Sequence, residues 1–358
     1  MRDEHGGQVG RIARLAGTVR EAVGAAHSGR DAVIGRAMRE GRRSGTGTIA
    51  PDGEAVAPAG VGTSRGGVLG SGIALIVDSG CDVPPGIAAR YGIQVVPLQI
   101  TYPDGSTYAD GVDITPAQVY ARMPQKIPTT SLPGADRILE ALETARAQGC
   151  TRVVGVTISS ALSGTFDLMR RLIADAPDLD GFVVDSRSIG LGAAMSAIAV
   201  ARAIEDGVPF GQLEAHILAC RSRTQVLFTV STLDYLIRGG RIGRAKGLAG
   251  TLLGVRPVFT CDGGGAFCVV QQLRGTKKAL ARMADIVAEQ VARYPRVLVA
   301  VADAAAPELS EEAERLLRER LAPGAIVGDE ILRGEISAAL GVHAGPGLVG
   351  MCYLGLPA

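Results

Sequence analysis

The 358-residue chain contains no tryptophan, and aromatic residues make up only 4% of it. Single-stranded nucleic acids are held largely by stacking of bases on aromatic rings, so this composition argues against that class of ligand. The formal net charge is +1, with 37 basic residues balanced by 36 acidic ones. The sequence therefore lacks the positive field that attracts phosphate backbones or anionic membrane surfaces.

Long apolar runs and paired cysteines are also missing. No stretch reaches the roughly 20 uninterrupted apolar residues that a spanning helix needs, and the N-terminus has no basic-then-apolar signal pattern. The six cysteines, at positions 81, 150, 220, 261, 268 and 352, show neither C-x-x-C spacing nor a histidine at metal-ligand spacing. We interpret them as reduced, mostly buried small hydrophobes, and we expect a cytoplasmic protein without stable membrane insertion.

The first 72 residues differ in character from the rest. Residues 42–72 are rich in Gly, Pro, Ser and Ala without any period, which is typical of a linker or a disordered segment. Before them, residues 9–24 place Ile12, Leu15, Val19 and Val23 at helical spacing. That pattern fits a marginal surface helix, and also a helix that binds a partner or a membrane surface. We expect residues 1–72 to be a largely disordered extension.

From Ile73 onward, apolar runs of strand length alternate with helical periods, which predicts an α/β fold with a mostly parallel sheet. The predicted strands are 73–77, 94–100, 153–158, 182–184 and 297–301. The predicted helices are 116–123, 136–148, 164–174 and 192–206. Ligands of such sheets lie outside the carboxyl ends of the strands. The segments D-S-G-C-D (78–82) and I-S-S-A-L-S-G-T (158–165) follow strands and fall at that edge.

Two hydroxyl-rich segments are candidates for an anion niche. The Ser163 hydroxyl is placed to cap the helix that follows it, and the free N–H groups of the first turn favour an anion. A plain helix cap explains the same pattern. P-T-T-S-L-P-G (128–134) predicts a second polar turn that opens the next helix. Together the two turns predict a polar, weakly charged niche.

Two glycine-rich segments add basic candidates. R-G-G-R-I-G (238–243) lacks both the P-loop and the dinucleotide-binding order of glycines. Its glycines suggest close backbone approach, with Arg238 or Arg241 reaching toward a negative head group. G-V-H-A-G-P-G (341–347) predicts a turn that carries His343, either as a site residue or as a structural hydrogen-bonder.

Four aspartates raise an alternative. Asp78, Asp82, Asp110 and Asp113 are possible Mg²⁺ ligands, which would fit a Mg-dependent phosphoryl-transfer or hydrolytic enzyme acting on a small substrate. Residues 106–114 equally read as a simple turn. No G-x-S-x-G elbow, H-E-x-x-H string or obvious carboxylate pair is present.

Nine motifs, in the order in which they occur, resemble those of the DegV family: D-S-G-C-D-V-P, V-V-P-L, Y-A-D-G-V-D-I, P-T-T-S-L-P, I-S-S-A-L-S-G-T, D-S-R-S-I-G-L-G, L-D-Y-L-I-R-G-G-R-I-G, L-R-G-T-K-K-A and H-A-G-P-G-L-V-G. The resemblance covers Ile73 to the C-terminus. These are bacterial fatty-acid-binding proteins, among them the lipid-binding subunit of fatty acid kinase. The resemblance implies a two-domain α/β fold, with a mostly parallel sheet flanked by helices (73–225) and a smaller C-terminal α/β domain (226–358).

The resemblance also implies a function. The acyl chain of a long-chain fatty acid would lie in a tunnel of the first domain, with its carboxylate near the domain interface. A separate fatty acid kinase catalytic subunit would phosphorylate that carboxylate, so this chain itself would be non-catalytic and would need no cofactor.

Residues that match the family's motifs form the expected binding set. The residues are Thr130, Ser131, Ser160, Ser163, Gly164, Arg238, Arg274 and His343. By the resemblance, Thr130, Ser163 and His343 would hold the carboxylate, and the two arginines would lie near the head group. Leu132 and Gly134 stand where Gln and Ser are common in the family's turn, which alters the polar detail beside Thr130.

Overall fold

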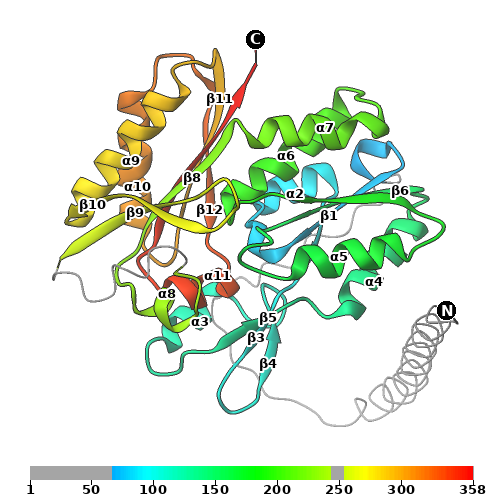
Figure 1. The fold of residues 1–358 in the computed structure, drawn as a ribbon, viewed down its shortest axis with the longest axis horizontal. Helices are drawn as coiled ribbons and strands as arrows, with labels where there is room; N and C mark the ends of the chain where they lie inside the picture. The colour runs from blue at the N-terminus through cyan, green and yellow to red at the C-terminus, as the bar shows by residue number, and fades with distance from the viewer. Residues whose placement is uncertain (1–66, 243–253, 358) are drawn as a thin grey trace, which may run out of the picture. The chain divides into compact units, whose positions relative to one another are not determined.

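The computed structural model describes residues 67–242 and 254–357, all within one structural unit (Figure 1). The expected surface helix at 9–24 and nearly all of the expected extension lie outside the described residues. Close to the end of that extension, Val68 in the short 3-10 helix η1 (Val68–Gly70) is completely buried. The packed part of the chain therefore begins before Ile73.

The first sheet contains four parallel strands in the order β2-β1-β6-β7. They are β1 (Ile73–Asp78), β2 (Gln94–Val96), β6 (Arg152–Thr157) and β7 (Asp180–Asp185). Alternate side chains of β1 enter different cores. Ala74 and Ile76 pack in the core beneath α4 (Ala135–Ala147) and α5 (Thr165–Ala174), whereas Leu75 and Val77 face the core that contains α6 (Leu191–Glu205). Both faces of the sheet are covered, as a parallel sheet requires.

The second sheet has six strands in the order β10-β9-β8-β13-β11-β12, of which only β11 and β12 pair in parallel. The strands are β8 (Thr224–Thr229), β9 (Val255–Cys261), β10 (Phe267–Arg274), β11 (Arg296–Asp303), β12 (Ile326–Glu335) and β13 (Val349–Leu356). Helices α9 (Thr276–Val291) and α10 (Pro307–Arg320) cover one face (Figure 1). The opposite face shares its core with the first sheet.

Helix α6 lies between the two sheets and joins their cores. Every residue of α6 except Arg202 and Glu205 is buried. A helix that is apolar on all sides is stable only when it is surrounded by protein. Its many alanines leave room for a sheet on each side, and α7 (Phe210–Arg221) packs along it (Figure 1).

Two predicted segments fold differently from expectation. The strand predicted at 94–100 is broken at Pro97, which has no N–H for a ladder. Only its first part joins the parallel sheet, and β3 (Gln99–Thr101) instead pairs with β4 (Thr107–Ala109) and β5 (Thr129–Ser131) in a small antiparallel sheet. The predicted turn at 128–134 therefore contains a strand, in which Thr130 pairs with Ile100.

The short helices complete the fold. They are α2 (Pro85–Tyr91), α3 (Pro116–Arg122), α8 (Asp234–Arg238), α11 (Ala338–Ala344) and the 3-10 helix η2 (Ser79–Cys81). Thr115 and Gln118 form a reciprocal capping box at the start of α3. His343, expected in a glycine-rich turn, lies instead in the last turn of α11.

The predicted α/β class, with a parallel sheet flanked by helices and a second sheet domain, is confirmed. The boundary expected at residue 226 stays a prediction. Among the helices of the described segments, none is both long enough and apolar enough to cross a membrane.

Candidate functional site

A largely apolar cavity, which we call the central cavity, lies between the carboxyl ends of the first sheet and the inner face of the second. Its volume is about 260 Å³. Its walls come from the loops after β6 and β7, from β5, from β8, β10, β11 and β13, and from α11. The resemblance implied a tunnel within the first domain; the cavity here is lined from both sheets.

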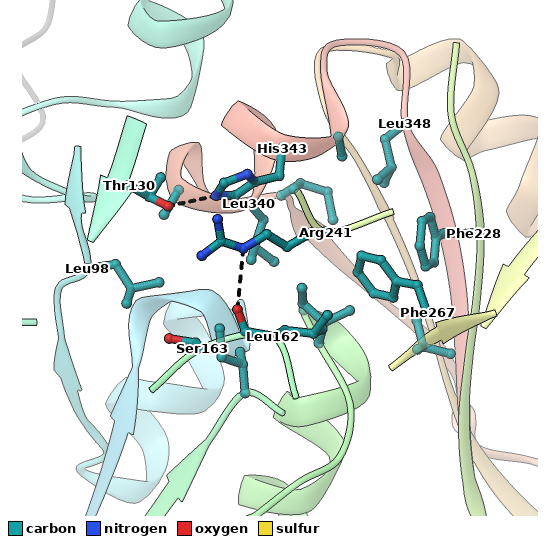
Figure 2. Close-up of a pocket in the computed structure, with 18 of the residues that line it drawn as sticks. Leu98, Thr130, Leu162, Ser163, Phe228, Arg241, Phe267, Leu340, His343 and Leu348 are labelled. Atoms are coloured by element: carbon teal, nitrogen blue, oxygen red, sulfur yellow. Dashed lines mark hydrogen bonds between the residues drawn. The ribbon is translucent and has the colours of Figure 1, made fainter. Parts of the chain in front are cut away.

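Polar residues gather at one end of the central cavity (Figure 2). Thr130 Oγ1 and His343 Nε2 share a hydrogen bond of 2.6 Å. Burial, together with the positive charge of Arg241, lowers the pKa of His343 to about 4, so the imidazole is neutral at pH 7. Arg241 is the one permanently charged side chain among the described residues that line the cavity.

Arg241 is held by backbone carbonyl groups. Its Nη1 donates to the carbonyl oxygen of Gly239 at 2.7 Å, and its Nε donates to that of Leu162 at 3.4 Å (Figure 2). No carboxylate of the described residues forms an ion pair with it. Since a guanidinium has five N–H donors, several remain for an anion that enters the cavity.

Steric limits explain why two glycines, Gly239 and Gly240, precede Arg241. A Cβ at Gly239 would lie 2.1 Å from Nδ1 of His343, so the backbone of the loop passes directly over the imidazole. The next residue, Gly240, has a φ of 70°, in the left-handed region that favours glycine. This reversal after α8 directs Arg241 into the cavity while Arg238 stays outside it.

The loop after β6 supplies the second hydroxyl. Ser163 Oγ accepts a hydrogen bond from the N–H of Thr165, the first residue of α5, at 3.3 Å. It also lies 2.8 Å from the Thr165 hydroxyl. The prediction that Ser163 caps α5 is wrong in position, because the N-cap is Gly164, which has no side-chain cap; Ser163 precedes it, bonds the N–H of Thr165 in a local turn and also lines the cavity.

The opposite end of the central cavity is aromatic and aliphatic. Phe228 and Phe267 line it with their ring centroids 5.0 Å apart, and Phe259 stacks behind Phe228. Figure 2 shows these two lining rings across the cavity from the Thr130 and His343 pair. Three of the six phenylalanines in the chain thus form one cluster, which spacing in the sequence did not indicate.

The residues predicted for the site separate into two groups. Five line the central cavity: Thr130, Ser131, Ser163, Gly164 and His343. Three do not: Ser160, Arg238 and Arg274 are exposed. The Ser160 hydroxyl donates to Asp185, and Arg238 borders a separate hollow with Lys126. The expected ligand contacts of all eight stay predictions.

The four aspartates considered as Mg²⁺ ligands are used by the fold. Asp78 accepts the N–H of Ile158, and Asp82 accepts the N–H of Ser337. Asp110 accepts the Ser79 hydroxyl and the N–H of Ala338, whereas Asp113 accepts the N–H of Ala109 in its own turn, as the simple-turn reading of this segment expected. Within residues 67–242 and 254–357, no group of three or more His, Cys, Asp or Glu side chains is placed to hold a metal ion.

Burial changes the ionisation of three of these carboxyl groups. It raises the pKa of Asp78 to about 7, and it raises the pKa values of Asp82 and Asp110 as well. The neighbouring Asp110 charge adds to the effect at Asp78 and Asp82, while hydrogen bonds from backbone and side-chain donors oppose it. The cluster holds the start of α11, and the end of the same helix carries His343.

Comparison with known proteins gives consistent results. Residues 72–355 match the model of a family described as "Uncharacterised protein, DegV family". A DegV domain-containing protein of Clostridium perfringens is 35% identical over 279 residues, which cover 78% of this chain and 97% of the relative. A DegV family protein from Thermus thermophilus, whose structure concerns fatty acid binding, is 30% identical with a TM-score of 0.72 and covers 79% of this chain and 99% of its own. A stearic acid-binding protein from Eubacterium ventriosum is 27% identical, with a TM-score of 0.69, over 78% and 97% of the two chains.

Proposed function

This chain belongs to the DegV family, and from that premise we propose that it binds one long-chain fatty acid in the central cavity. The acyl chain lies along the apolar wall toward Phe228 and Phe267, and the carboxylate lies at the end formed by Thr130, Ser163, Arg241 and His343. The observation that carries this proposal is the polarity of the cavity, which is apolar along its length and has hydrogen-bond donors at one end.

The apolar wall would supply most of the affinity. Burying about 14 methylenes contributes about 11 kcal/mol in gross terms, at about 0.8 kcal/mol for each. A hydrogen bond to a charged group contributes about 1.5–3 kcal/mol. The polar end therefore sets the orientation of the lipid, and the tail sets how tightly it is held.

The neutral histidine suits a carboxylate ligand through the Thr130 hydroxyl. When His343 Nε2 carries the proton, it donates to Thr130 Oγ1, and the Thr130 hydroxyl proton is then directed to a carboxylate oxygen. Arg241 supplies the one full positive charge beside them. A carboxylate held by hydroxyls and a single guanidinium keeps one oxygen free to attack a phosphoryl group.

We further propose that the protein does not catalyse the reaction itself. It presents the carboxylate to a separate fatty acid kinase subunit, which forms an acyl-phosphate, and both act in the cytoplasm. Ser163 already lies against the N–H and hydroxyl of Thr165, and the described residues that line the cavity include no carboxylate that would act as its base. Ser163 is thus a residue that holds the ligand rather than a nucleophile.

Native mass spectrometry of the full-length protein purified from cells tests the binding step. We expect the mass of one fatty acid to accompany the protein and to disappear after lipid extraction. Lipid-free protein that takes up no added palmitate or oleate would refute the proposal.

The division of labour between head and tail has its own test. Thr130→Val and Ser163→Ala should reduce phosphorylation by a supplied kinase subunit by about tenfold or more, since each removes a hydrogen bond to a charged group. Lipid retention should change by less, because the tail contacts remain. Equal loss of retention and phosphorylation would contradict the proposed division.

A further inference from the structure

A second cavity, which we call the arginine cavity, lies on the other side of the loop that follows β7. Ser186, Arg187 and Ser188 of this loop border the arginine cavity, whereas Ile189, Gly190 and Leu191 border the central cavity. Its other walls are the end of α7, the hairpin between β9 and β10, and the end of α9. The volume of the arginine cavity is about 430 Å³. Nothing in the function proposed above uses this space.

Positive charge dominates its lining. Arg187, Arg221 and Arg293 border the cavity, and Asp262 is the acidic residue among the described residues around it. One Asp262 oxygen accepts the N–H groups of Gly264 and Ala266 in its own turn. The Asp185 carboxylate lies beside them as well, since it accepts the N–H of Arg187 and acts on Arg221. Three guanidinium groups and two carboxylates leave a local excess of about one positive charge if all are ionised.

The arginines of this cavity bind to backbone carbonyl groups rather than to acids. Arg187 Nη1 donates to the carbonyl oxygen of Gly263 at 2.9 Å, and Arg221 Nη1 donates to that of Asp185 at 3.2 Å. No described carboxylate forms an ion pair with Arg187, Arg221 or Arg293. Burial, and the nearby charge of Arg187, lower the pKa of Arg221, and the Asp185 carboxylate only partly opposes them. An anion between these groups would relieve that repulsion.

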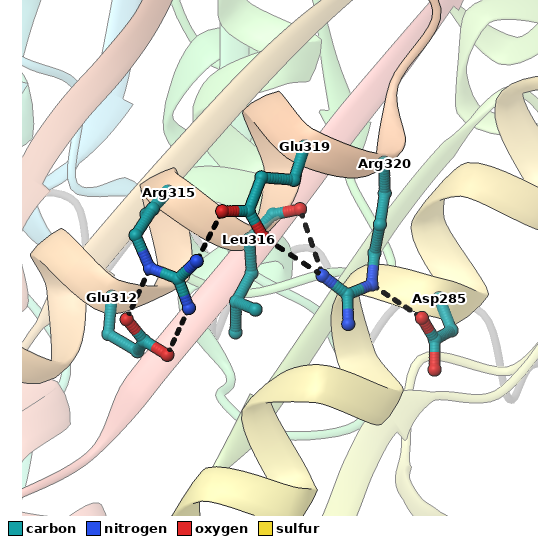
Figure 3. A network of polar contacts seen from close by, with 6 residues as sticks. All are labelled: Asp285, Glu312, Arg315, Leu316, Glu319 and Arg320. Carbon is teal, nitrogen blue, oxygen red and sulfur yellow. Dashed lines mark hydrogen bonds and ion pairs between the residues drawn. The ribbon is translucent and has the colours of Figure 1, made fainter.

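Two arginines of α10, which covers the same sheet, have acidic partners. On α10, Arg315 contacts Glu312 and Glu319, and Arg320 contacts Asp285 of α9 (Figure 3). These guanidinium groups lie on the surface with acids within reach on the same or the neighbouring helix. Arg187, Arg221 and Arg293 thus lack the acidic partners that Arg315 and Arg320 have on the same side of the chain's second sheet.

The backbone around Arg187 is fixed before any ligand binds. Arg187 has a φ of 49°, in the left-handed region that non-glycine residues rarely adopt, and the Asp185 carboxylate accepts its N–H at 2.9 Å. A Cβ at Gly265, in the β9–β10 turn, would lie 3.0 Å from the Arg187 Cα, so this turn packs closely against it. Such conformations persist where the surroundings hold them, and they are frequent at ligand sites.

We propose that the arginine cavity binds the phosphate group of a small phosphate monoester. The planar guanidinium fork matches the oxygens of a phosphate, and the local excess of positive charge favours an anion. Hydroxyl groups of Ser222, Thr224 and Thr260 and the amide of Gln225 border the same space. These side chains suit the hydroxyl-rich remainder of a sugar phosphate better than an acyl chain. The cavity is large enough for a phosphate group with an organic substituent.

Isothermal titration of the full-length protein tests this, with inorganic phosphate and glucose 6-phosphate as probes at constant ionic strength. We expect saturable binding of glucose 6-phosphate, and affinity lower by about tenfold or more in Arg221→Gln and in Arg293→Gln, because each removes a charged hydrogen-bond donor. Arg315→Gln is the matched control, since it loses the same charge from a surface position and should change affinity by less than about twofold. Thermal melting establishes that each variant is folded.

The outcomes separate the alternatives. Binding of both probes with equal affinity, lost in the two cavity variants, would also support the proposal and assign the site to the phosphate group alone. The proposal is overturned if neither probe saturates below about 10 mM, which corresponds to a binding free energy weaker than about −3 kcal/mol, or if Arg315→Gln weakens binding as much as the cavity variants do. Binding of a phosphoserine peptide but of neither small probe would overturn it in favour of a protein-docking site. Lipid occupancy, measured in parallel, should be unchanged in every variant, so a failure here leaves the proposed lipid function standing.

Discussion

At the start of α11, the carboxyl groups of Asp82 and Asp110 accept backbone N–H groups, whereas at its end the imidazole of His343 bonds to the Thr130 hydroxyl. Burial acts on both ends and favours the uncharged form of each group. It raises the pKa of the acids and lowers that of the histidine. At its start, this short helix is held by carboxyl groups that resist ionisation. At its end, it carries an imidazole that resists protonation.

Opposite pH dependences follow for the two ends. A raised acid pKa means that the folded state keeps a proton that the unfolded state has lost, so stability falls as pH rises. A lowered histidine pKa means that the unfolded state takes up a proton first, so stability falls as pH decreases. The two ends of α11 can therefore be distinguished by titration as well as by mutation.

The largest expected effect concerns Asp78, which lies beside Asp82 and Asp110 and has a pKa of about 7. In the wild type, the free energy of unfolding should fall as pH rises from about 4 through 7, and Asp78→Asn should remove the part of this dependence that comes from Asp78, leaving the parts from Asp82 and Asp110. The stability of the variant relative to the wild type should thus increase by up to about 4 kcal/mol between about pH 4 and pH 9. Urea unfolding at both pH values measures this change.

The control for Asp78 is Asp206→Asn, at an exposed position after α6. It removes a carboxyl group from the surface rather than from the core, so the change in relative stability between about pH 4 and pH 9 should be much smaller than for Asp78→Asn. If Asp78→Asn and Asp206→Asn behave alike, burial does not control the Asp78 carboxyl group, and the contrast between the two ends of α11 fails.

The next effect concerns His343, whose imidazole should stay neutral in lipid-free protein until pH falls to about 4. Relative to the unfolded chain, this costs about 3 kcal/mol of stability as pH decreases from about 6.5 to 4. A bound carboxylate favours the charged imidazole, so lipid should raise the pKa of His343. NMR titration of the ring with and without palmitate measures this shift. An unchanged pKa of His343 in loaded protein would place the carboxylate away from this end of the cavity.

The start of α11 can also be loosened by removing the hydrogen-bond acceptors of Asp110. Asp110→Ala leaves the Ser79 hydroxyl and the Ala338 N–H without an acceptor and should cost about 2 kcal/mol. Asp110→Asn keeps one acceptor oxygen and should cost less. Urea unfolding compares the two variants, and amide hydrogen exchange at Ser337 and Ala338 reports whether the start of α11 opens. Equal losses from both variants would mean that the one acceptor oxygen kept by Asn contributes nothing, and would contradict this account of the start of α11.

Much of this arrangement could be predicted from the sequence because local signals are strong there. The alternation of strands and helices from Ile73 gave the first sheet, and apolar runs such as 153–158 were readable from hydrophobicity alone. Thr130, Ser163 and His343 lie far apart in the chain, yet ordered motifs predicted that they would share one site, and all three line the central cavity.

The position of Arg241 and the role of the aspartates depend on three-dimensional contacts, which the sequence does not indicate. The sequence left Arg238 and Arg241 as alternatives, and only the reversal at Gly239 and Gly240 places the second one in the cavity. The four aspartates were possible Mg²⁺ ligands, but Asp82 and Asp110 bind N–H groups as distant as those of Ser337 and Ala338. Contacts across more than 200 residues have no local signal, so the supporting role of these acids could not be predicted.

The smallest expected effect concerns the end of α11 that carries His343. The variant used there changes the packing around the imidazole without changing any charge. Gly239→Ala adds only a methyl group, but its Cβ would lie 2.1 Å from His343 Nδ1, so the imidazole must move away from Thr130. We expect lipid affinity to fall by about tenfold, or about 1.4 kcal/mol, within the usual cost of overpacking. Gly211→Ala is the matched control, because nothing lies within 4 Å of the added Cβ there and alanine favours the helix. Because Gly239→Ala changes no titratable group, the pH dependence assigned to Asp78 should survive in it; loss of that dependence would mean that the two ends of α11 are coupled rather than independent.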